Sequence, residues 1–489
     1  MSRSRRNTSK LATASAPRQQ SENSRPPATI PNRNPIAKNS ISRKGLVRLT
    51  LWPLVAATFF MVSGGTYGTE DIVHGAGYGR AILILLLTPL LWSLPTAFMI
   101  GELSSALPYE GGYYAWVRRA MGNFWGFQEA WLSLVASIFD MAIYPTLFVA
   151  YLTRMFPWFQ ENGRGWWVAL AVVVACAMLN IAGVKVVSMT SLWLFFALSA
   201  PFVAIVVLAP FKMGALANAV TKPTTSTVDI LGGLLICMWN YMGWDNASTI
   251  ATEVERPQRT YPRAMLVAVG IVALSYVLPP AAMWMTGLAP TAWETGSWAD
   301  IAGLLGGPLL RIGVVLGGIL SAFGMFNALV MSYSRLPLAM AQDGMLPGIF
   351  AKLHKKSRAP WVAIMALAMC WAMCLGLGFA RLVTLDILLY GFSLLLEFIA
   401  LVVLRFREPD LARPFRVPGG LFGAVAIGIP PMLLLGFSII RSEHEQVWNM
   451  SSFTFGMILI AAGFVAYAVN HAFKPSGWAI RKDKPQLTA

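Results

Sequence analysis

Long apolar runs recur along this chain and are separated by short polar connections. Each run is close to the roughly 20 residues that an α-helix needs to cross the hydrocarbon core of a bilayer. The pattern therefore predicts an all-α polytopic membrane protein with a helical domain at 49–472. We count twelve spans, at residues 49–74, 81–104, 122–152, 166–184, 189–209, 230–252, 261–287, 309–334, 361–379, 383–404, 421–440 and 452–472.

A glycine-rich stretch interrupts the first span. Residues 63–71 read Ser-Gly-Gly-Thr-Tyr-Gly-Thr-Glu-Asp, and closely spaced glycines disfavour a continuous helix. Non-helical backbone is tolerated in a membrane only where it is buried in protein or lines a wet cavity. The break therefore predicts a binding site. The alternative is that Gly64 and Gly65 only let a neighbouring helix pack closely.

A second interruption lies in the sixth span. Residues 239–249 read Trp-Asn-Tyr-Met-Gly-Trp-Asp-Asn-Ala-Ser-Thr, which places a glycine, two asparagines and a carboxylate in mid-membrane. Breaks in the first and sixth of twelve helices are typical of two inverted five-helix repeats with a site between them. We expect these repeats at about 49–209 and 230–404, followed by two additional helices at about 421–472.

The composition excludes a soluble globular protein, since 56% of the 489 residues are hydrophobic and only 12% are charged. A net charge of +16 is compatible with nucleic-acid binding, but eleven of the 38 Lys and Arg lie in residues 1–48. That polar tail is expected to be disordered and suits the anionic surface of a membrane. We predict a lipid bilayer as the partner of this charge, and no nucleic acid.

Basic residues in the connections give the orientation. The connections on the side of the N-terminus carry fifteen Lys and Arg, and those on the opposite side carry eight. The positive-inside rule then places both termini, including the C-terminal tail at 473–489, in the cytoplasm. We expect the protein in the cell (plasma) membrane, and the sequence indicates no particular oligomeric state.

No enzyme signature is present in the sequence. The four cysteines lie in apolar runs and are expected to pack as small side chains. Cys370 and Cys374 share a helix face, but no His or carboxylate lies beside them to complete a metal site. We find no nucleophile–base pair and no cofactor loop, and no ring of like residues such as a channel needs. We therefore predict no cofactor, no metal and no catalysis; a membrane sensor is the remaining alternative to a transporter.

Carboxylates within the spans carry the most specific signal. An unpaired carboxylate at mid-membrane costs roughly 3 kcal/mol or more, so each must be protonated, face a wet cavity or bind a cation. We expect Asp245 to bind an ammonium group because it lies in the broken sixth span, and Glu102 to be a solvated helix end or a gate contact. The carboxylates predicted within the spans are Glu70, Asp71, Glu129, Asp140, Asp245 and Glu397.

Several motifs resemble those of the amino acid–polyamine–organocation (APC) transporters, most closely the plant-type polyamine uptake branch and its bacterial relatives. The order and spacing of the motifs across residues 49–418 carry the resemblance more than any one of them. They are Ser63-Gly64-Gly65 with Gly68 and Glu70-Asp71; 124–129 with Asp140 and Tyr144-Pro145; Trp244-Asp245 with Ser248-Thr249; 253–262; Ser334-Arg335-Leu336-Pro337 with 343–347; and Glu397-Phe398, Leu404-Arg405 and Arg413-Pro414-Phe415.

The resemblance implies alternating-access transport of polyamines or related cationic amines, as a proton symporter; the alternative is a transporter or exchanger of neutral or cationic amino acids. The fifth span lacks the lysine that some proton-coupled members have, so a carboxylate must carry the proton. The candidates are Glu129, Asp140 and Glu397. The implied substrate-binding residues are Ser63, Gly64, Gly65, Thr66, Glu70, Asp140, Asn240, Tyr241, Gly243, Trp244 and Asp245.

The orientation gives a first prediction. Single cysteines replacing Asn162 and Lys355 should lie on opposite sides of the membrane, because the first is in an outer connection and the second in an inner one. A membrane-impermeant maleimide added to intact cells should label Asn162→Cys and leave Lys355→Cys unlabelled. Labelling of Lys355→Cys alone would contradict the predicted topology.

Overall fold

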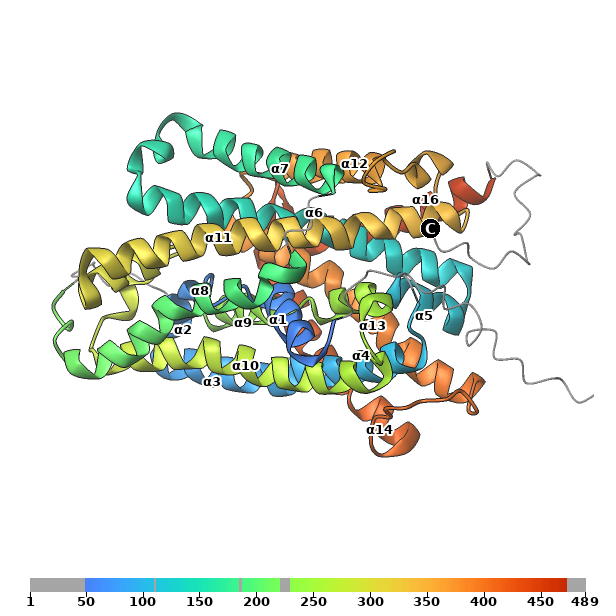
Figure 1. The fold of residues 1–489 in the computed structure, drawn as a ribbon, viewed down its shortest axis with the longest axis horizontal. Helices are drawn as coiled ribbons and strands as arrows, with labels where there is room; N and C mark the ends of the chain where they lie inside the picture. Colours follow the sequence, from blue (N-terminus) through green and yellow to red (C-terminus); the bar gives the residue numbers. More distant parts are fainter. Residues whose placement is uncertain (1–48, 110, 184–186, 220–228, 473–489) are drawn as a thin grey trace, which may run out of the picture. The chain divides into compact units, whose positions relative to one another are not determined.

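The structure, a computed structural model, describes residues 49–109, 111–183, 187–219 and 229–472, without the side chains of 187–194 and 249–253. The predicted tails at 1–48 and 473–489 lie outside the described residues. The described part is almost entirely helical, as Figure 1 shows. Its only paired strands are the two-residue β1 (Gln446–Val447) and β2 (Met450–Ser451). The predicted all-α membrane fold is therefore confirmed.

The helices of the described residues group into twelve segments that follow the predicted spans. Nine helical stretches are long and apolar enough to cross a membrane, and α1 and α12 are shorter apolar helices; the broken sixth span makes the twelfth. In order, the segments are α1 (Leu51–Val62) with α2 (Glu70–Ala76); α3 (Tyr78–Thr88), η2 (Pro89–Ser93) and α4 (Leu94–Ala106); α6 (Asn123–Met155); α7 (Arg164–Ala182); α8 (Val187–Leu208); α9 (Ile230–Asn240) with η5 (Trp244–Glu253); α10 (Pro257–Met285); α11 (Trp298–Gln342); α12 (Trp361–Met373); α13 (Phe379–Arg407); α14 (Gly420–Ala426) with α15 (Ile429–His444); and α16 (Ser452–Ala472).

Two helical features differ from the sequence-based expectation. Helix α5 (Gly112–Met121) forms within a connection that was expected to be a loop. Helix α11 begins eleven residues before the predicted span and bends at Gly307, whose φ of 76° is not helical. Both segments contain glycines and polar residues. These residues interrupt an apolar run, so a span is harder to recognise in the sequence, but they do not prevent helix formation. The remaining short helices are η3 (Pro157–Gly163), η4 (Ala209–Lys212), η6 (Pro290–Ala292) and η7 (Gly348–Ala351).

Both predicted helix breaks are present. Helix α1 ends at Val62 and α2 begins at Glu70; between them Gly64, Gly65 and Gly68 have φ of 57°, 106° and 87°. In the sixth segment, α9 ends at Asn240 and η5 begins at Trp244, with Gly243 at φ 85°. These positive φ values are unfavourable for side-chain-bearing residues and routine for glycine. The glycines therefore determine where each helix stops.

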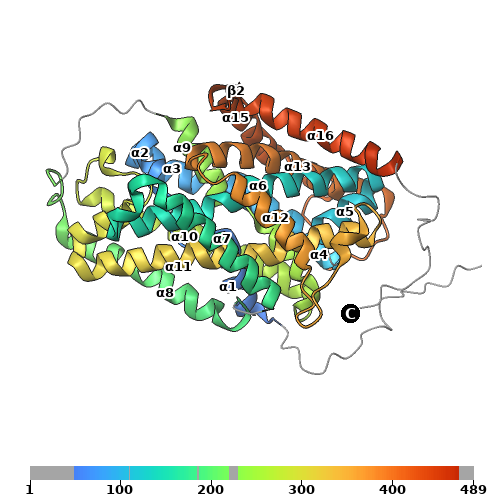
Figure 2. The ribbon, with the colours of Figure 1, turned by 90° about the horizontal axis from the view of Figure 1, so that it is seen from above.

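The two broken segments pack beside each other in opposite directions. Helix α2 contacts α9, and α1 contacts η5, so the first half of one segment lies against the second half of the other. Segments five apart pack together elsewhere as well: α4 on α10, α6 on α11, and α7 on α12. Helix α6 packs against both α11 and α13; it lies beside α11 in Figure 1 and beside α13 in Figure 2. This pairing is the arrangement expected of inverted repeats.

Glu102 is not the solvated helix end that was one expectation for it. Its side chain at the end of α4 is 1% exposed and accepts two hydrogen bonds from the Arg405 guanidinium, at 3.0 and 2.5 Å. The Arg413 guanidinium lies 3.2 Å away, and the Val417 N–H donates at 2.7 Å. One buried carboxylate thus ties α4, α13 and the segment that follows α13 together.

This ion-pair cluster gives a second prediction. Glu102→Gln would leave two buried guanidinium groups without a carboxylate, and breaking such a pair typically costs about 3–5 kcal/mol. We expect a clear fall in the Tm of the purified protein. Glu161→Gln is the matched control, because Glu161 pairs with Arg164 at 3.2 Å with its side chain 64% exposed, where such pairs contribute little. Equal Tm shifts in the two variants would show that the cluster does not stabilise the fold.

Candidate functional site

The two helix breaks meet at one place in the protein interior. The Tyr276 hydroxyl on α10 donates to the Asn240 carbonyl at 2.9 Å and to the Ser63 carbonyl at 3.4 Å. The Asn240 side chain donates to the Gly68 carbonyl at 3.3 Å. Carbonyls freed by the unwinding of both helices therefore face each other and a shared set of donors.

Hydrogen bonds to neighbouring helices stabilise the first break. The Ser321 hydroxyl on α11 donates to the Gly64 carbonyl at 2.5 Å, and the Thr66 hydroxyl donates to the Ser275 carbonyl on α10 at 2.8 Å. A Cβ on Gly64 would overlap the Met325 sulfur and approach the Ser321 hydroxyl to 2.6 Å. Gly64 therefore fits both interpretations. It lets α11 pack closely, and this close packing fixes the position of the break.

A narrow cavity lies between the breaks and is lined by α1, α6, the sixth segment and α11. Its volume is about 10 Å³, enough for about one water molecule. A substrate must therefore displace lining side chains, and methionines adapt readily to such changes. The lining residues are Met61, Val62, Ser63, Asp140, Tyr144, Trp239, Asn240, Met242, Gly243, Asn246, Met325 and Tyr333.

Asp140 is the carboxylate in the cavity wall. It is 3% exposed and accepts hydrogen bonds from the Tyr144 hydroxyl at 3.0 Å, the Trp239 indole at 3.3 Å and the Tyr333 hydroxyl at 3.1 Å. These three donors come from three segments and fix the position of the carboxyl group. Asp140 has no cationic partner among the described residues. Its position combines a negative charge with an aromatic wall, the surroundings that attract organic cations.

Two further aspartates lie close to Asp140. Asp245, 4% exposed at the start of η5, accepts a hydrogen bond from the Tyr390 hydroxyl at 2.7 Å. Asp386 lies one helical turn before Tyr390 on α13, is fully buried, and accepts no hydrogen bond from any described residue. Asp386 lies within electrostatic range of both Asp140 and Asp245. We call Asp140, Asp245 and Asp386 the acidic group.

The sequence-based analysis missed Asp386. The signal was available, because the residue lies in the predicted span 383–404 and is as exceptional there as Glu397. Burial with both oxygens unpaired makes it the most costly of the three aspartates. It therefore adds a third carboxyl group without a cationic partner among the described residues near the cavity.

Glu129 and Glu397 form a second cluster of acidic residues, which we call the inner pair. Glu129 on α6 accepts hydrogen bonds from the hydroxyls of Ser133 and Ser393 at 2.8 and 3.0 Å. Glu397 on α13 is fully buried and interacts electrostatically with Glu129 and Asp245; within the described part of the chain, neither of its oxygens has a hydrogen-bond partner. Glu129 precedes Asp140 by eleven residues of α6, about 16 Å along the helix axis. The inner pair therefore lies toward the α6 N-terminus from the cavity.

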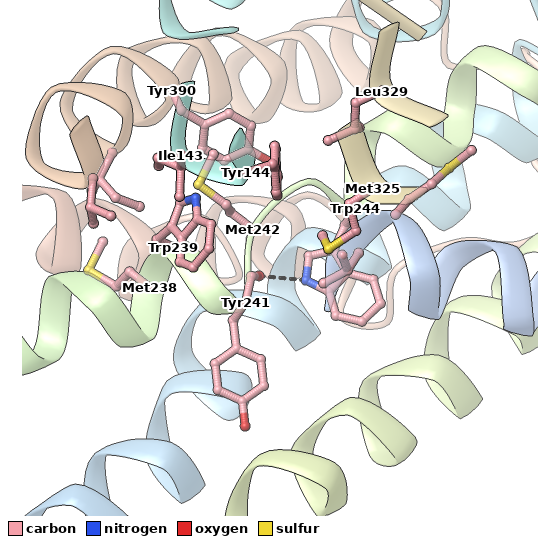
Figure 3. Close-up of a cluster of buried hydrophobic side chains, with 14 of the residues drawn as sticks. Ile143, Tyr144, Met238, Trp239, Tyr241, Met242, Trp244, Met325, Leu329 and Tyr390 are labelled. Atoms are coloured by element: carbon pink, nitrogen blue, oxygen red, sulfur yellow. Dashed lines mark hydrogen bonds between the residues drawn. The ribbon is translucent and has the colours of Figure 1, made fainter. Parts of the chain in front are cut away.

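Aromatic side chains separate into two groups at the sixth-segment break (Figure 3). The centroids of the Trp239 and Tyr144 rings lie 6.2 Å apart, and both residues line the cavity. The Tyr241 hydroxyl instead donates to the Leu85 carbonyl at 2.9 Å, and the Trp244 indole donates to the Tyr241 carbonyl at 2.7 Å. Tyr241 and Trp244 thus stabilise the break through hydrogen bonds to backbone carbonyls rather than lining the cavity.

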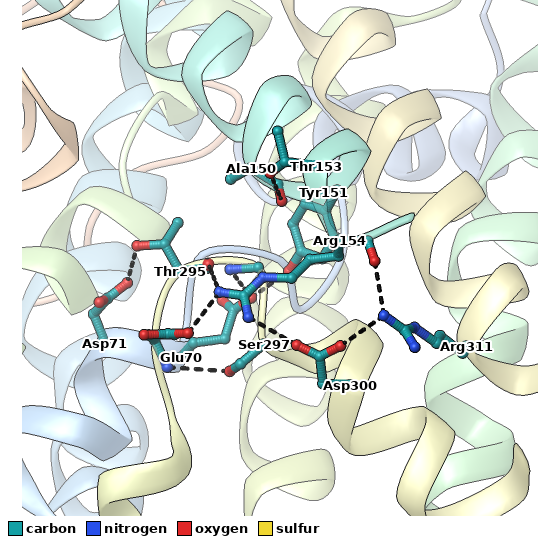
Figure 4. Close-up of polar contacts among 12 residues, drawn as sticks. Glu70, Asp71, Ala150, Tyr151, Thr153, Arg154, Thr295, Ser297, Asp300 and Arg311 are labelled. Carbon is teal, nitrogen blue, oxygen red and sulfur yellow. Dashed lines mark hydrogen bonds and ion pairs between the residues drawn. The ribbon is translucent and has the colours of Figure 1, made fainter. Parts of the chain in front are cut away.

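Glu70 belongs to a polar network beyond the cavity (Figure 4). It accepts hydrogen bonds from the N–H groups of Gly68 at 2.7 Å and Gly296 at 3.1 Å, and from the Tyr151 hydroxyl. Beside it, the Thr295 hydroxyl donates to Asp71 at 2.8 Å. The network links α2 and the end of α6 to the segment before α11. These links close the helical bundle at this end of the first break.

The structure therefore divides the predicted site residues. Ser63, Asp140, Asn240 and Gly243 line the cavity; Asp245 lies next to it, and the inner pair lies further along α6 and α13. The residues placed elsewhere in the two breaks are Gly64, Gly65, Thr66, Glu70, Tyr241 and Trp244. Among the described residues no group of three or more His, Cys, Asp or Glu has a metal-binding arrangement.

A helical membrane domain with two broken, oppositely directed segments and a polar site between them defines a membrane transporter. Comparison with known sequences agrees with this assignment. The sequence profile of a family described as amino acid permease matches residues 55–463. The chain belongs to this amino acid permease family.

Relatives within the family include transporters of plants and bacteria. The chain is 34% identical to the polyamine transporter RMV1 of Arabidopsis thaliana over 439 residues, which covers 88% of this chain and 87% of the relative. It is 35% identical to the polyamine transporter PUT1 of Oryza sativa subsp. japonica, over 84% of this chain and 77% of the relative. It is 24% identical to the serine/threonine exchanger SteT of Bacillus subtilis, over 78% of this chain and 86% of the relative.

Proposed function

We propose that this protein transports polyamines or related cationic amines across the cell membrane by alternating access. The observation that carries the proposal is the acidic group, three buried aspartates that have no Lys, Arg or His partner among the described residues. A cationic substrate would neutralise this charge. A neutral solute would leave it unpaired at a cost of several kcal/mol. Names of relatives such as RMV1 and PUT1 support the same substrate class.

An α-amino acid is the alternative substrate, supported by the relation to SteT. It carries its own carboxylate, which in this type of fold binds to free N–H groups of a broken helix. Two such groups in the first break already have partners: Gly65 N–H donates to the Ser63 hydroxyl at 3.1 Å, and Gly68 N–H donates to Glu70 at 2.7 Å. Among the described residues that line the cavity there is no Lys, Arg or His. The site is therefore poorly suited to a substrate carboxylate.

Transport is driven by protons in this proposal, and the inner pair carries them. Glu129 and Glu397 are fully buried on α6 and α13, and Ser393, one helical turn before Glu397, donates to Glu129. A carboxyl group without a cationic partner inside a membrane is a typical proton carrier. Asp140, the third candidate from the sequence, lines the cavity and is assigned to the substrate. With both termini in the cytoplasm, the N-terminus of α6 is on the cytoplasmic side. The inner pair then lies between the cavity and the cytoplasm, where it can release a proton inward.

Substrate selectivity tests the role of the acidic group. Asp140→Asn and Asp245→Asn each remove a charge at constant volume, and loss of a charge-assisted hydrogen bond costs about 1.5–3 kcal/mol. We expect the apparent affinity for spermidine to fall by roughly 10- to 100-fold, measured as uptake into proteoliposomes. Inhibition of that uptake by neutral amino acids should change far less.

Asp410→Asn is the matched control, since Asp410 lies exposed in the connection after α13. It should transport spermidine like the wild type. Equal losses for spermidine and neutral amino acids in Asp140→Asn would indicate a structural role for this residue. Unchanged spermidine affinity in both site variants would contradict the proposal.

Proton coupling is tested at the inner pair. Glu129→Gln and Glu397→Gln remove the groups that would bind the proton while leaving the acidic group intact. We expect at least one of these variants to lose uphill accumulation of spermidine driven by an inward proton gradient, yet to retain exchange of internal for external spermidine. If both variants accumulate substrate with the pH dependence of the wild type, the inner pair is not the coupling site.

A further inference from the structure

A strongly basic turn precedes α12, at the end of the helical bundle opposite the polar network of Glu70 (Figure 1). Lys352, Lys355, Lys356 and Arg358 are all exposed, and the segment 344–361 contains no Asp or Glu. The turn borders a cavity of about 620 Å³, within the usual size range of ligand sites. The cavity is lined by Lys352, Leu353, His354, Lys355, Lys356 and Trp361. We call these six residues with Arg358 the basic turn.

The charges of the basic turn are uncompensated. None of Lys352, Lys355, Lys356 and Arg358 has an ion-pair partner among the described residues. Other basic residues at this end are paired: Arg118 with Asp343, and Arg119 with Glu408 at 2.6 Å. Like charges held close together repel, and a bound anion relieves this repulsion. The basic turn is therefore suited to an anion carrying more than one negative charge.

Hydrogen bonds fix the shape of the turn. The Ser357 hydroxyl donates to the Ile181 carbonyl at the end of α7 at 2.5 Å and lies 2.9 Å from His354 Nδ1. The backbone N–H of His354 donates to the Ala359 carbonyl at 2.8 Å. A turn anchored in this way holds its lysines around the cavity before a ligand arrives, so less conformational entropy is lost on binding.

The cavity lies where the chain enters the membrane. Trp361 is the first residue of α12, is 42% exposed, and lines the same cavity as the lysines. Ile349, just before the turn, is 49% exposed. Tryptophan at a helix end is typical of the membrane–water interface. A ligand there would meet cationic groups at one end and apolar side chains at the other, which matches a lipid rather than a soluble anion.

We propose that the basic turn binds the phosphorylated head group of an anionic phospholipid. Clusters of Lys and Arg immediately next to a membrane helix favour such lipids. The head-group phosphates would contact Lys352, Lys355 and Lys356, and the acyl chains would lie along Trp361 and α12. This site is separate from the substrate cavity, so the proposal does not depend on the identity of the transported solute.

The test is direct binding to the full-length protein purified in detergent, measured by native mass spectrometry. The probes are phosphatidylinositol 4-phosphate, phosphatidylcholine and the soluble inositol 1,4-bisphosphate. We expect the wild type to bind one phosphatidylinositol 4-phosphate in preference to phosphatidylcholine. The triple variant Lys352→Gln, Lys355→Gln, Lys356→Gln should bind it roughly 50- to 100-fold more weakly.

Two controls separate a specific site from general surface charge. Arg256→Gln, Arg259→Gln and Arg263→Gln remove the same number of charges from exposed residues that do not line the cavity, and this variant should bind the lipid within about twofold of the wild type. The triple Lys→Arg variant should also retain binding, since it keeps the charge. Equal weakening by both Gln variants, no weakening by either, or equally tight binding of the soluble bisphosphate would each overturn the proposal.

Discussion

Polar groups inside a membrane must find partners, and this constraint governs the whole structure. Water is absent from the hydrocarbon core, so a freed backbone group or an unpaired charge there costs several kcal/mol. The breaks at 63–69 and 241–243 are tolerated because hydroxyl groups bond to carbonyls in and beside them. Ser321 donates to the Gly64 carbonyl, and Tyr276 contacts the carbonyls of Ser63 and Asn240. The acidic group, in contrast, has no cationic partner among the described residues, and this imbalance is the basis of the proposed function.

The polar clusters at the two ends of the bundle explain how the site is enclosed. At one end, Glu70 and Asp71 tie α2 to the segment before α11; at the other, Glu102 ties α4 to α13 and the chain after it. Glu70 and Asp71 accept hydrogen bonds and Glu102 also pairs with two arginines, whereas Asp386 near the cavity has no hydrogen-bond partner among the described residues. Alternating access then requires that contacts at one end open while those at the other persist. The narrow cavity between them fits a conformation closed at both ends.

Much of the fold could be predicted from the sequence because apolar runs and glycine clusters act locally. The twelve spans and the breaks at Gly64 and Gly243 follow directly from such patterns. The site was less predictable, because which way a side chain points depends on packing between distant helices. Glu70 and Tyr241 were expected to contact the substrate, yet the structure directs them to Gly296 and Leu85. Asp386 was visible in the sequence, but its proximity to Asp140 arises only from the packing of α13.

Uptake by the purified wild-type protein in proteoliposomes tests the central claim most directly. Labelled spermidine, putrescine, arginine and leucine would be compared with and without an inward proton gradient. If the uncompensated acidic group selects cations, spermidine and putrescine should accumulate in a gradient-dependent manner and leucine should not. Accumulation of leucine in preference to both polyamines would contradict the account.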